Sequence, residues 1–280
     1  MNRILFEPGE IRDGRATFSD ARAEHVLNVL HGAEGQTLKT GILDGPIGTS
    51  VIERIEGNTV TVRCTHETSS LQPWLDLILA PPRPRAMKRL LPQLASLGVR
   101  RIVLVGAEKV EKAFWGAQLL KEEIYRPLLV DGLQQAGITI VPTIHIAKNF
   151  KRFIDFQFNS DFGGQSPLIV AHPSPLRGQS PTFGGQTPAL GGQAPAIGGR
   201  APVIFGGQAP NVLGQSPVLA VGPEGGWTDA EVALLEEKGF VRMSLGARIL
   251  RTDTALIALI SRLMEFYDCP QMGEERKDEN

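Results

Sequence analysis

Two glycine-containing loops near the C-terminus carry the residue types and spacing that could bind a small ligand through backbone groups. The first loop is Gly222-Pro223-Glu224-Gly225-Gly226, which directly follows the apolar run 218–221. The second loop is the sequence LGARILRTDT at 245–254, which precedes a strongly apolar segment. Because glycine has no Cβ, a ligand can reach backbone amides there that another residue would cover. The two loops together predict a ligand site, although either loop alone could simply make a turn.

One helix and one strand separate the two loops and must position them. Thr228 and Glu231 have the spacing of a capping box, in which each side chain satisfies a free amide of the first helical turn. Gly239 stands where the helix needs a left-handed end. In open α/β sheets, ligands bind beyond the carboxyl ends of the strands, and the first loop directly follows an expected strand. We therefore expect the site at that edge of a sheet.

This ordered pair of motifs resembles the C-terminal signature of the RsmE-type 16S ribosomal RNA (uracil-N3) methyltransferases, which are members of the SPOUT superfamily. The family pattern reads GPEGG, a helix, and then LG-x-R-ILRTETA, and this chain has Asp253 where the family has glutamate. The resemblance implies an α/β fold, in which a SPOUT-type trefoil-knotted parallel sheet domain is preceded by a small PUA-like β-barrel domain. We expect the PUA-like domain at residues 1–72 and the SPOUT methyltransferase domain at residues 73–280.

The resemblance also implies S-adenosylmethionine as the cofactor, in a pocket formed by the two loops and the end of an expected strand at 168–173. Backbone groups of Leu245, Gly246 and Leu250 would meet the adenine, and residues 222–226 would approach the ribose and methionine parts. The implied cofactor-binding residues are His172, Gly222, Glu224, Gly225, Gly226, Leu245, Gly246, Ile249 and Leu250.

The implied reaction is transfer of a methyl group to N3 of a uracil in 16S ribosomal RNA within the small ribosomal subunit. N3–H belongs to an imide and is a poor nucleophile until its proton leaves, so the site needs a base or a cation that stabilises the deprotonated ring. Arg251 is the catalytic candidate for that cation, since it lies in the second loop. Alternatively, Arg251 pairs with Asp253 or Glu224 and braces the loops. No residue stands out as the base, and N3 is reachable only in an unpaired or flipped uracil.

The most basic stretch of the chain lies in the segment 81–97, which contains no acidic residue. Lysine and arginine side chains on one helical turn could hold phosphate oxygens of RNA, which positions the RNA without reading its sequence. A solvated helix face is the alternative. Pro92 lies inside the segment and is expected to kink or shorten the helix. The candidate RNA-binding residues are Arg83, Arg85, Lys88 and Arg89.

Composition limits the classes of function. The chain has 280 residues, 42% of them hydrophobic, which suits one large or two modest domains. A formal net charge of −1 excludes a general electrostatic attraction to nucleic acid, so RNA contacts must come from local patches. The two cysteines, Cys64 and Cys269, fit neither a disulfide framework nor a zinc site, and no metal is expected. No apolar run has the length or flanks of a membrane span or signal segment, so a cytoplasmic protein is expected.

Strand and helix patterns change at about residue 72. Before it, short β segments are separated by turn signals such as Asp44-Gly45, which predicts a hairpin. After it, apolar strands alternate with helices, which predicts a parallel sheet. The expected segments are strands at 37–43, 49–55, 59–64, 75–80, 101–105, 138–144 and 168–173, and helices at 81–97, 114–135 and 255–267. The last helix is apolar all round, so we expect it to be buried, in part against the second subunit of a homodimer.

Residues 174–216 repeat the pattern Gly-Gly-Gln-x-Pro, with prolines at 181, 188, 195 and 202. Glycine, proline and glutamine at this density cannot support a packed core, so we expect an insertion that loops out from the surface. A β-solenoid is the alternative, because one apolar position recurs in each unit. A charged, frayed tail is expected at 273–280.

Two departures from the family pattern leave other functions open. Ser96 stands where the family tends to have glutamate, and Ile138 stands where it has arginine. A catalytically impaired RNA-binding or ribosome-assembly protein is therefore an alternative, which cofactor binding would distinguish. A SPOUT ribose 2′-O-methyltransferase is a second alternative, although its motifs differ. A nicotinamide dinucleotide site lacks the GxGxxG spacing and the later acid.

Overall fold

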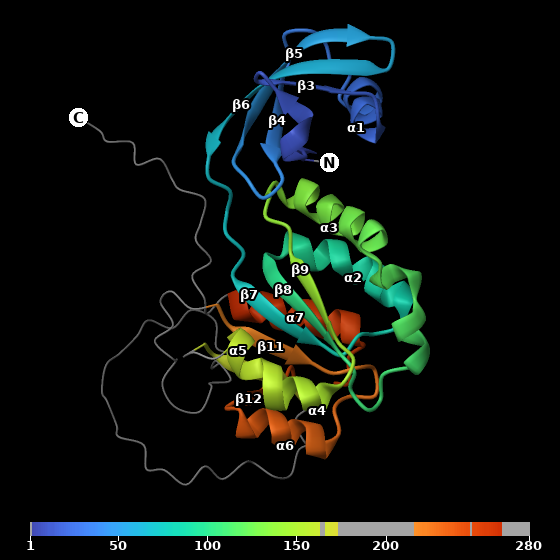
Figure 1. Ribbon diagram of the computed structural model, residues 1–280, viewed down its shortest axis with the longest axis vertical. Coiled ribbons are helices and arrows are strands. Elements are labelled where there is room, and N and C mark those ends of the chain that lie inside the picture. The colour runs from blue at the N-terminus through green and yellow to red at the C-terminus, as the bar shows by residue number, and fades with distance from the viewer. Residues whose placement is uncertain (1, 163–165, 173–215, 247, 265–280) are drawn as a thin grey trace, which may run out of the picture.

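The computed structural model describes residues 2–162, 166–172, 216–246 and 248–264. Residues 174–215 of the expected insertion and the whole expected tail at 273–280 lie outside these ranges. Two six-stranded sheets organise the described residues (Figure 1). Most buried side chains of each sheet form a cluster of their own, although Leu5 and Leu43 of the N-terminal unit belong to the cluster of the second sheet. The chain therefore folds as two units, which the segment 69–74 connects.

The N-terminal sheet has the strand order β1-β4-β5-β6-β3-β2. Strands β1 and β4 pair in parallel, and the other neighbours pair antiparallel. Asp44, at a φ of 56°, and Gly45 turn the chain between β4 and β5, so the predicted hairpin is confirmed. The strands are β1 Ile4–Phe6, β2 Ile11–Arg12, β3 Arg15–Phe18, β4 Thr37–Ile42, β5 Ile47–Glu56 and β6 Thr59–Thr68. The helical segments of this unit are η1 Pro8–Glu10, α1 Ala21–Glu24 and the π-helix η2 His25–Val29.

The second sheet is wholly parallel and has the order β12-β10-β11-β7-β8-β9. Its central strand β7 is buried along its whole length, as expected for a sheet covered on both faces. The predicted α/β class is therefore confirmed. The strands are β7 Leu75–Leu79, β8 Val99–Val105, β9 Thr143–Ala147, β10 Leu168–Ala171, β11 Val218–Val221 and β12 Val241–Met243.

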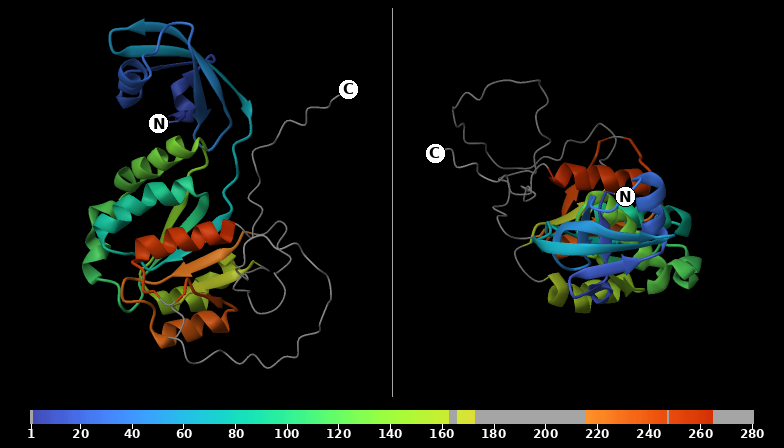
Figure 2. Two further views of the ribbon diagram at one scale, coloured as in Figure 1. Left: turned by 180° about the vertical axis from the view of Figure 1, so that it is seen from behind. Right: turned by 90° about the horizontal axis from the view of Figure 1, so that it is seen from above.

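Helices cover both faces of the parallel sheet (Figures 1 and 2). On one face, α7 contacts α2, and α2 packs against α3. On the other face lie α4 and α5, with α6 next to them, and Phe158 of α5 contacts Phe240 just after α6. The helices are α2 Pro84–Ser96, α3 Glu122–Ala136, α4 Phe150–Arg152, α5 Phe158–Phe162, α6 Asp229–Glu237 and α7 Thr252–Met264. Shorter segments are the 3-10 turns η3 Lys112–Gly116 and η4 Gln118–Leu120, and the π-helix η5 Phe153–Gln157.

Three predicted elements need correction. The helix expected from residue 114 begins only at Glu122, because two 3-10 turns precede it. The strand expected at 138–144 begins only at Thr143, since Pro142 has no amide for a sheet hydrogen bond. Helix α2 is not shortened at Pro92 and continues to Ser96. There α3 comes so close that a Cβ on Gly132 would lie 2.0 Å from Pro92 O.

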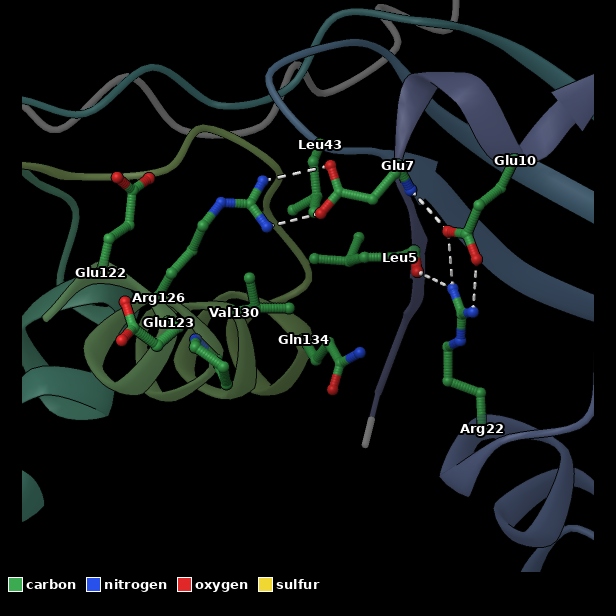
Figure 3. Close-up of a pocket in the computed structure, with 11 residues that line it drawn as sticks. Leu5, Glu7, Glu10, Arg22, Leu43, Glu122, Glu123, Arg126, Val130 and Gln134 are labelled. Atoms are coloured by element: carbon green, nitrogen blue, oxygen red, sulfur yellow. Dashed lines mark hydrogen bonds and ion pairs between the residues drawn. The ribbon is translucent and has the colours of Figure 1, made fainter.

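The two units meet along α3, from Arg126 near its start to Gly137 at its end. Arg126 donates two hydrogen bonds to the Glu7 carboxylate, beside a cavity of about 440 Å³ between the units (Figure 3). Arg3 donates from Nε to Gly137 O at 2.9 Å and from Nη1 to Thr40 O at 2.7 Å. A single guanidinium thus joins the end of α3 to strand β4. These bonds fix the N-terminal sheet against α3.

A buried polar cluster in the N-terminal sheet predicts a pH-dependent stability. His66 Nε2 lies 2.7 Å from Thr40 Oγ1. Burial lowers the pKa of His66, and the nearby Arg3 charge lowers it further. The unfolded chain therefore protonates this imidazole more readily than the folded chain, so the free energy of unfolding should fall as the pH drops below about 6.5.

The His66→Gln variant should lose less stability than the wild type between about pH 7.5 and about pH 5.5. Urea unfolding midpoints of both proteins at the two pH values measure this difference. An identical pH dependence in the two proteins would contradict the assignment to His66.

Candidate functional site

A cleft of about 430 Å³ lies at the carboxyl ends of β10, β11 and β12, where parallel sheets commonly bind ligands. Both predicted loops line it, and the end of β10 supplies Ala171 and His172. The amide of His172 donates to Met243 O at 3.1 Å, which ties the end of β10 to the end of β12. The remaining residues along the cleft are Val221–Trp227, Met243–Gly246, Arg248–Leu250, Thr252, Ala255 and Leu259.

The first loop depends on glycine for two different reasons. Gly226 has a φ of 68°, and its amide donates to Pro223 O at 2.8 Å, which closes a tight turn. Side chains are strained at that φ, whereas glycine is not. Gly222 has no such φ, but a Cβ there would lie only 3.0 Å from Trp227 N. Lack of space therefore requires glycine at position 222, and the backbone conformation requires it at position 226.

The second loop also contains a left-handed glycine. Gly246 has a φ of 104°, and its amide donates to Ser244 Oγ at 3.1 Å. Beyond it, Ile249 is 93% exposed and Leu250 is 37% exposed, which is unusual for aliphatic side chains on a loop beside a cleft.

Two contacts brace the first loop from neighbouring elements, and a third ties α6, which follows the loop, to the segment after β8. The amide of Arg83, directly before α2, donates to Glu224 Oε1 at 3.1 Å. Lys109 Nζ, beyond the end of β8, donates to Gly225 O at 2.8 Å. The buried Glu231 accepts from the Glu108 amide at 2.8 Å and also completes the predicted capping box with Thr228. The loop is therefore held in place by groups that lie outside the cleft.

All nine predicted cofactor residues line this one cleft, namely His172, Gly222, Glu224, Gly225, Gly226, Leu245, Gly246, Ile249 and Leu250. Trp227, Ser244, Arg248 and Thr252 also line it and were not singled out from the sequence. Their positions in or directly beside the two glycine loops could have predicted that they line the cleft.

Arg251 does not line the cleft. Its side chain is 74% exposed and pairs with Asp253, with 3.4 Å between Arg251 Nε and Asp253 Oδ1. Of the two bracing contacts expected as an alternative, the one with Asp253 is present. Glu224 instead accepts from Arg83.

The four basic side chains of the α2 region are all exposed, but two of them are paired. Arg83 Nε lies 2.9 Å from Glu111 Oε1, and Arg89 Nη2 lies 3.4 Å from Asp253 Oδ2. Arg85 and Lys88 have no ion-pair partner among the described residues. These two side chains are therefore available to an external anion.

The lining of the cleft fits an organic ligand with a flat ring and polar acceptors. Apolar side chains and glycine backbone predominate, which is typical of small-molecule sites. Within the described ranges, Trp227 Nε1 is a buried donor without a protein acceptor. Among the same residues, no three or more His, Cys, Asp or Glu side chains gather where they could hold a metal ion. None of the described helices is both long and apolar enough to cross a membrane.

Comparisons with known proteins identify relatives over most of the chain. A family model described as an RNA methyltransferase domain matches residues 69–181 and 206–264. Ribosomal RNA small subunit methyltransferase E of Treponema pallidum is 31% identical over 267 residues, which cover 92% of this chain and 88% of the relative. Ribosomal RNA small subunit methyltransferase E 1 of Borreliella burgdorferi is 25% identical over 92% of this chain and 95% of its own length.

A solved structure has the same fold. It is a ribosomal RNA small subunit methyltransferase E from Neisseria gonorrhoeae, described as bound to S-adenosyl methionine. It superposes with a TM-score of 0.65 at 21% sequence identity and covers 95% of this chain and 98% of its own.

Proposed function

Because this chain belongs to the ribosomal RNA small subunit methyltransferase E family, we propose that it methylates 16S ribosomal RNA with S-adenosylmethionine as donor and that the target atom is N3 of a uracil. The observation that carries this proposal is the single cleft lined by both glycine loops and by His172. A dedicated site for the donor is what separates a methyltransferase from a protein that only binds RNA.

Different residues of the cleft would contact different parts of the cofactor. Glycines 222 and 226 would allow the first loop to approach the ribose and methionine parts, while Leu245, Gly246 and Leu250 would hold the adenine. When bound, S-adenosylmethionine supplies an electrophilic methyl group, which replaces the N3 proton of the uracil. Once cofactor and base fill the largely apolar cleft, less water would remain there, which would strengthen electrostatic interactions at the reacting atoms.

Arg251 supplies the positive charge that the reaction needs. Once the N3 proton leaves, negative charge spreads over the imide, and a guanidinium beside the ring stabilises it. Arg251 directly follows Leu250, which lines the cleft, and precedes α7. Its exposure leaves it accessible to a uracil that enters from solvent.

One experiment tests the proposal against both alternatives. The purified protein is titrated with S-adenosylmethionine by calorimetry and then incubated with the cofactor and small-subunit RNA. The RNA is digested to nucleosides, and mass spectrometry identifies the methylated product. We expect 3-methyluridine. 2′-O-methyluridine would establish the ribose methyltransferase instead, and a protein that binds RNA but not the cofactor would be an assembly factor.

The exposed basic side chains of the α2 region are the proposed binding site for RNA phosphates. They are Arg83, Arg85, Lys88 and Arg89. Removing Arg85 or Lys88 should weaken RNA binding more than removing Arg83, because Arg83 already pairs with Glu111. Each lost phosphate contact should also reduce the slope of log K against log salt by about 0.7 to 0.9.

Filter binding of RNA at several salt concentrations measures both effects. Lys151→Ala, on α4 at the opposite face of the sheet, is the matched control. Equal losses of RNA affinity in Lys88→Ala and Lys151→Ala would contradict a specific RNA-binding site on α2.

The proposal also covers the identity of the two domains, a knot in the second domain and the oligomeric state. Residues 1–72 form a PUA-like RNA-binding domain and residues 73–280 a SPOUT domain, a division supported by the two separate six-stranded sheets. A trefoil knot is supported by the sheet order, in which β11 lies between β10 and β7. A homodimer is supported by Ile249 and Leu250, whose exposed side chains a second subunit would cover.

A further inference from the structure

The Asp253 carboxylate lies between two arginines from different parts of the fold. Asp253 Oδ1 is 3.4 Å from Arg251 Nε in the second loop, and Asp253 Oδ2 is 3.4 Å from Arg89 Nη2 on α2. The carboxylate is 24% exposed, whereas the Arg89 and Arg251 side chains are 57% and 74% exposed. One acid thus joins the proposed RNA helix to the proposed catalytic loop.

The position of Asp253 is fixed more firmly than that of either arginine. Asp253 lies in the first turn of α7, and its Oδ1 accepts from the Thr254 amide at 2.9 Å. Helix α7 is itself anchored by the buried Leu256, Leu259 and Ile260. Arg251, in contrast, makes no side-chain hydrogen bond or ion pair other than this one among the described residues.

Asp253 carries its negative charge at neutral pH. Burial opposes ionisation, but the Thr254 amide and the charges of Arg251 and Arg89 outweigh it and lower the pKa of Asp253. Because exposed ion pairs contribute little to stability, the exchange of one arginine for another partner has a small cost. A phosphate of RNA can therefore take Arg89 while Asp253 keeps Arg251.

We propose that Asp253 is a positioning residue, which holds the Arg251 guanidinium at the rim of the cleft and links it to Arg89 on the RNA-facing helix. This inference rests on the proposed function, in which Arg251 stabilises the deprotonated uracil. Asp253 acts through Arg251 and touches neither cofactor nor base. Its removal should lower kcat and leave cofactor binding intact.

Asp253→Asn removes the charge and keeps the shape and the bond from the Thr254 amide. We expect kcat for RNA methylation to fall about tenfold, with unchanged KM for RNA, unchanged affinity for S-adenosylmethionine and an unchanged melting temperature. Asp253→Glu should restore most of the rate, since its carboxylate reaches the same arginines. Asp155→Asn, on the exposed side of η5, removes an equal charge elsewhere and should have wild-type kinetics.

A double substitution tests whether Asp253 acts through Arg251. In an Arg251→Gln background, Asp253→Asn should cause no further loss of kcat. An equal tenfold loss in that background would overturn the inference, as would Asp253→Asn with a wild-type kcat.

A chemical readout does not depend on methylation. Phenylglyoxal modifies free guanidinium groups, and peptide mass spectrometry reports the rate at each arginine. Arg251 should react faster in Asp253→Asn than in the wild type, whereas Arg85, which has no ion-pair partner among the described residues, should react equally in both. Equal rates at Arg251 would overturn the inference even if the protein methylates RNA. Faster modification without methylation would uphold the inference and overturn the proposed function.

Discussion

A Gly226→Val variant is expected to bind S-adenosylmethionine roughly 5- to 150-fold more weakly than the wild-type protein. Gly226 has a φ of 68°, and a β-branched residue is strained by about 1 to 3 kcal/mol in that region. The loop would relieve the strain by changing conformation, which removes the backbone surface that the cofactor needs. Isothermal titration calorimetry measures the dissociation constant.

Three further glycine variants separate backbone strain from loss of space. Gly226→Asn should be much milder, because asparagine tolerates a positive φ and nothing lies within 4 Å of the position of the added Cβ. Gly222→Ala tests space alone, since its Cβ would lie 3.0 Å from Trp227 N. Gly57→Val, at a φ of 58° in the turn between β5 and β6, introduces the same strain far from the cleft. If Gly57→Val weakens cofactor binding as much as Gly226→Val, the loss comes from general destabilisation.

An Arg251→Gln variant is expected to methylate RNA about 100- to 1000-fold more slowly while binding the cofactor normally. Glutamine keeps hydrogen-bonding capacity but removes the charge that stabilises the deprotonated uracil. Since Arg251 lies outside the cleft lining, the calorimetric dissociation constant of S-adenosylmethionine should not change. Single-turnover rates on small-subunit RNA measure the effect on the chemical step.

The Arg251→Lys variant and a surface control sharpen that comparison. Lysine retains the charge without the planar guanidinium, so an intermediate rate is expected. Arg152→Gln, at the last residue of α4, removes an arginine on the opposite face of the sheet and should leave the rate unchanged. A wild-type rate in Arg251→Gln would show that Arg251 only braces the second loop through Asp253.

Local signals in the sequence predicted the parts of the site that local chemistry determines. Thr228 and Glu231 form their capping box, and Gly226 and Gly246 adopt the positive φ values that make glycine necessary. The Asp44-Gly45 hairpin belongs to the same class. In each case the requirement lies within a few neighbouring residues, so the residue types alone reveal it.

Long-range packing decided the features that the sequence did not predict. Helix α2 continues past Pro92, where α3 packs on it at Gly132, a partner remote in sequence. The helical segment at 150–162 has no periodicity that predicts a helix. The packing role of its phenylalanines is visible only in the folded chain, where Phe158 contacts Phe240. Likewise, the pairing of Arg89 with Asp253 joins residues that only the folded chain brings together. The strand order that places β10 between β12 and β11 is of the same kind.

The contact of Gly132 with Pro92 has a consequence for substrate selection. The two helices pack closely there, and α3 also carries Arg126, which bonds to Glu7 beside the N-terminal sheet. The separation between that sheet and the basic side of α2 is therefore set before any substrate arrives. If RNA contacts both surfaces, as proposed above, it must already have, or must itself adopt, a matching curvature. A rigid RNA whose curvature does not match this fixed separation should therefore bind more weakly than a flexible RNA of the same sequence.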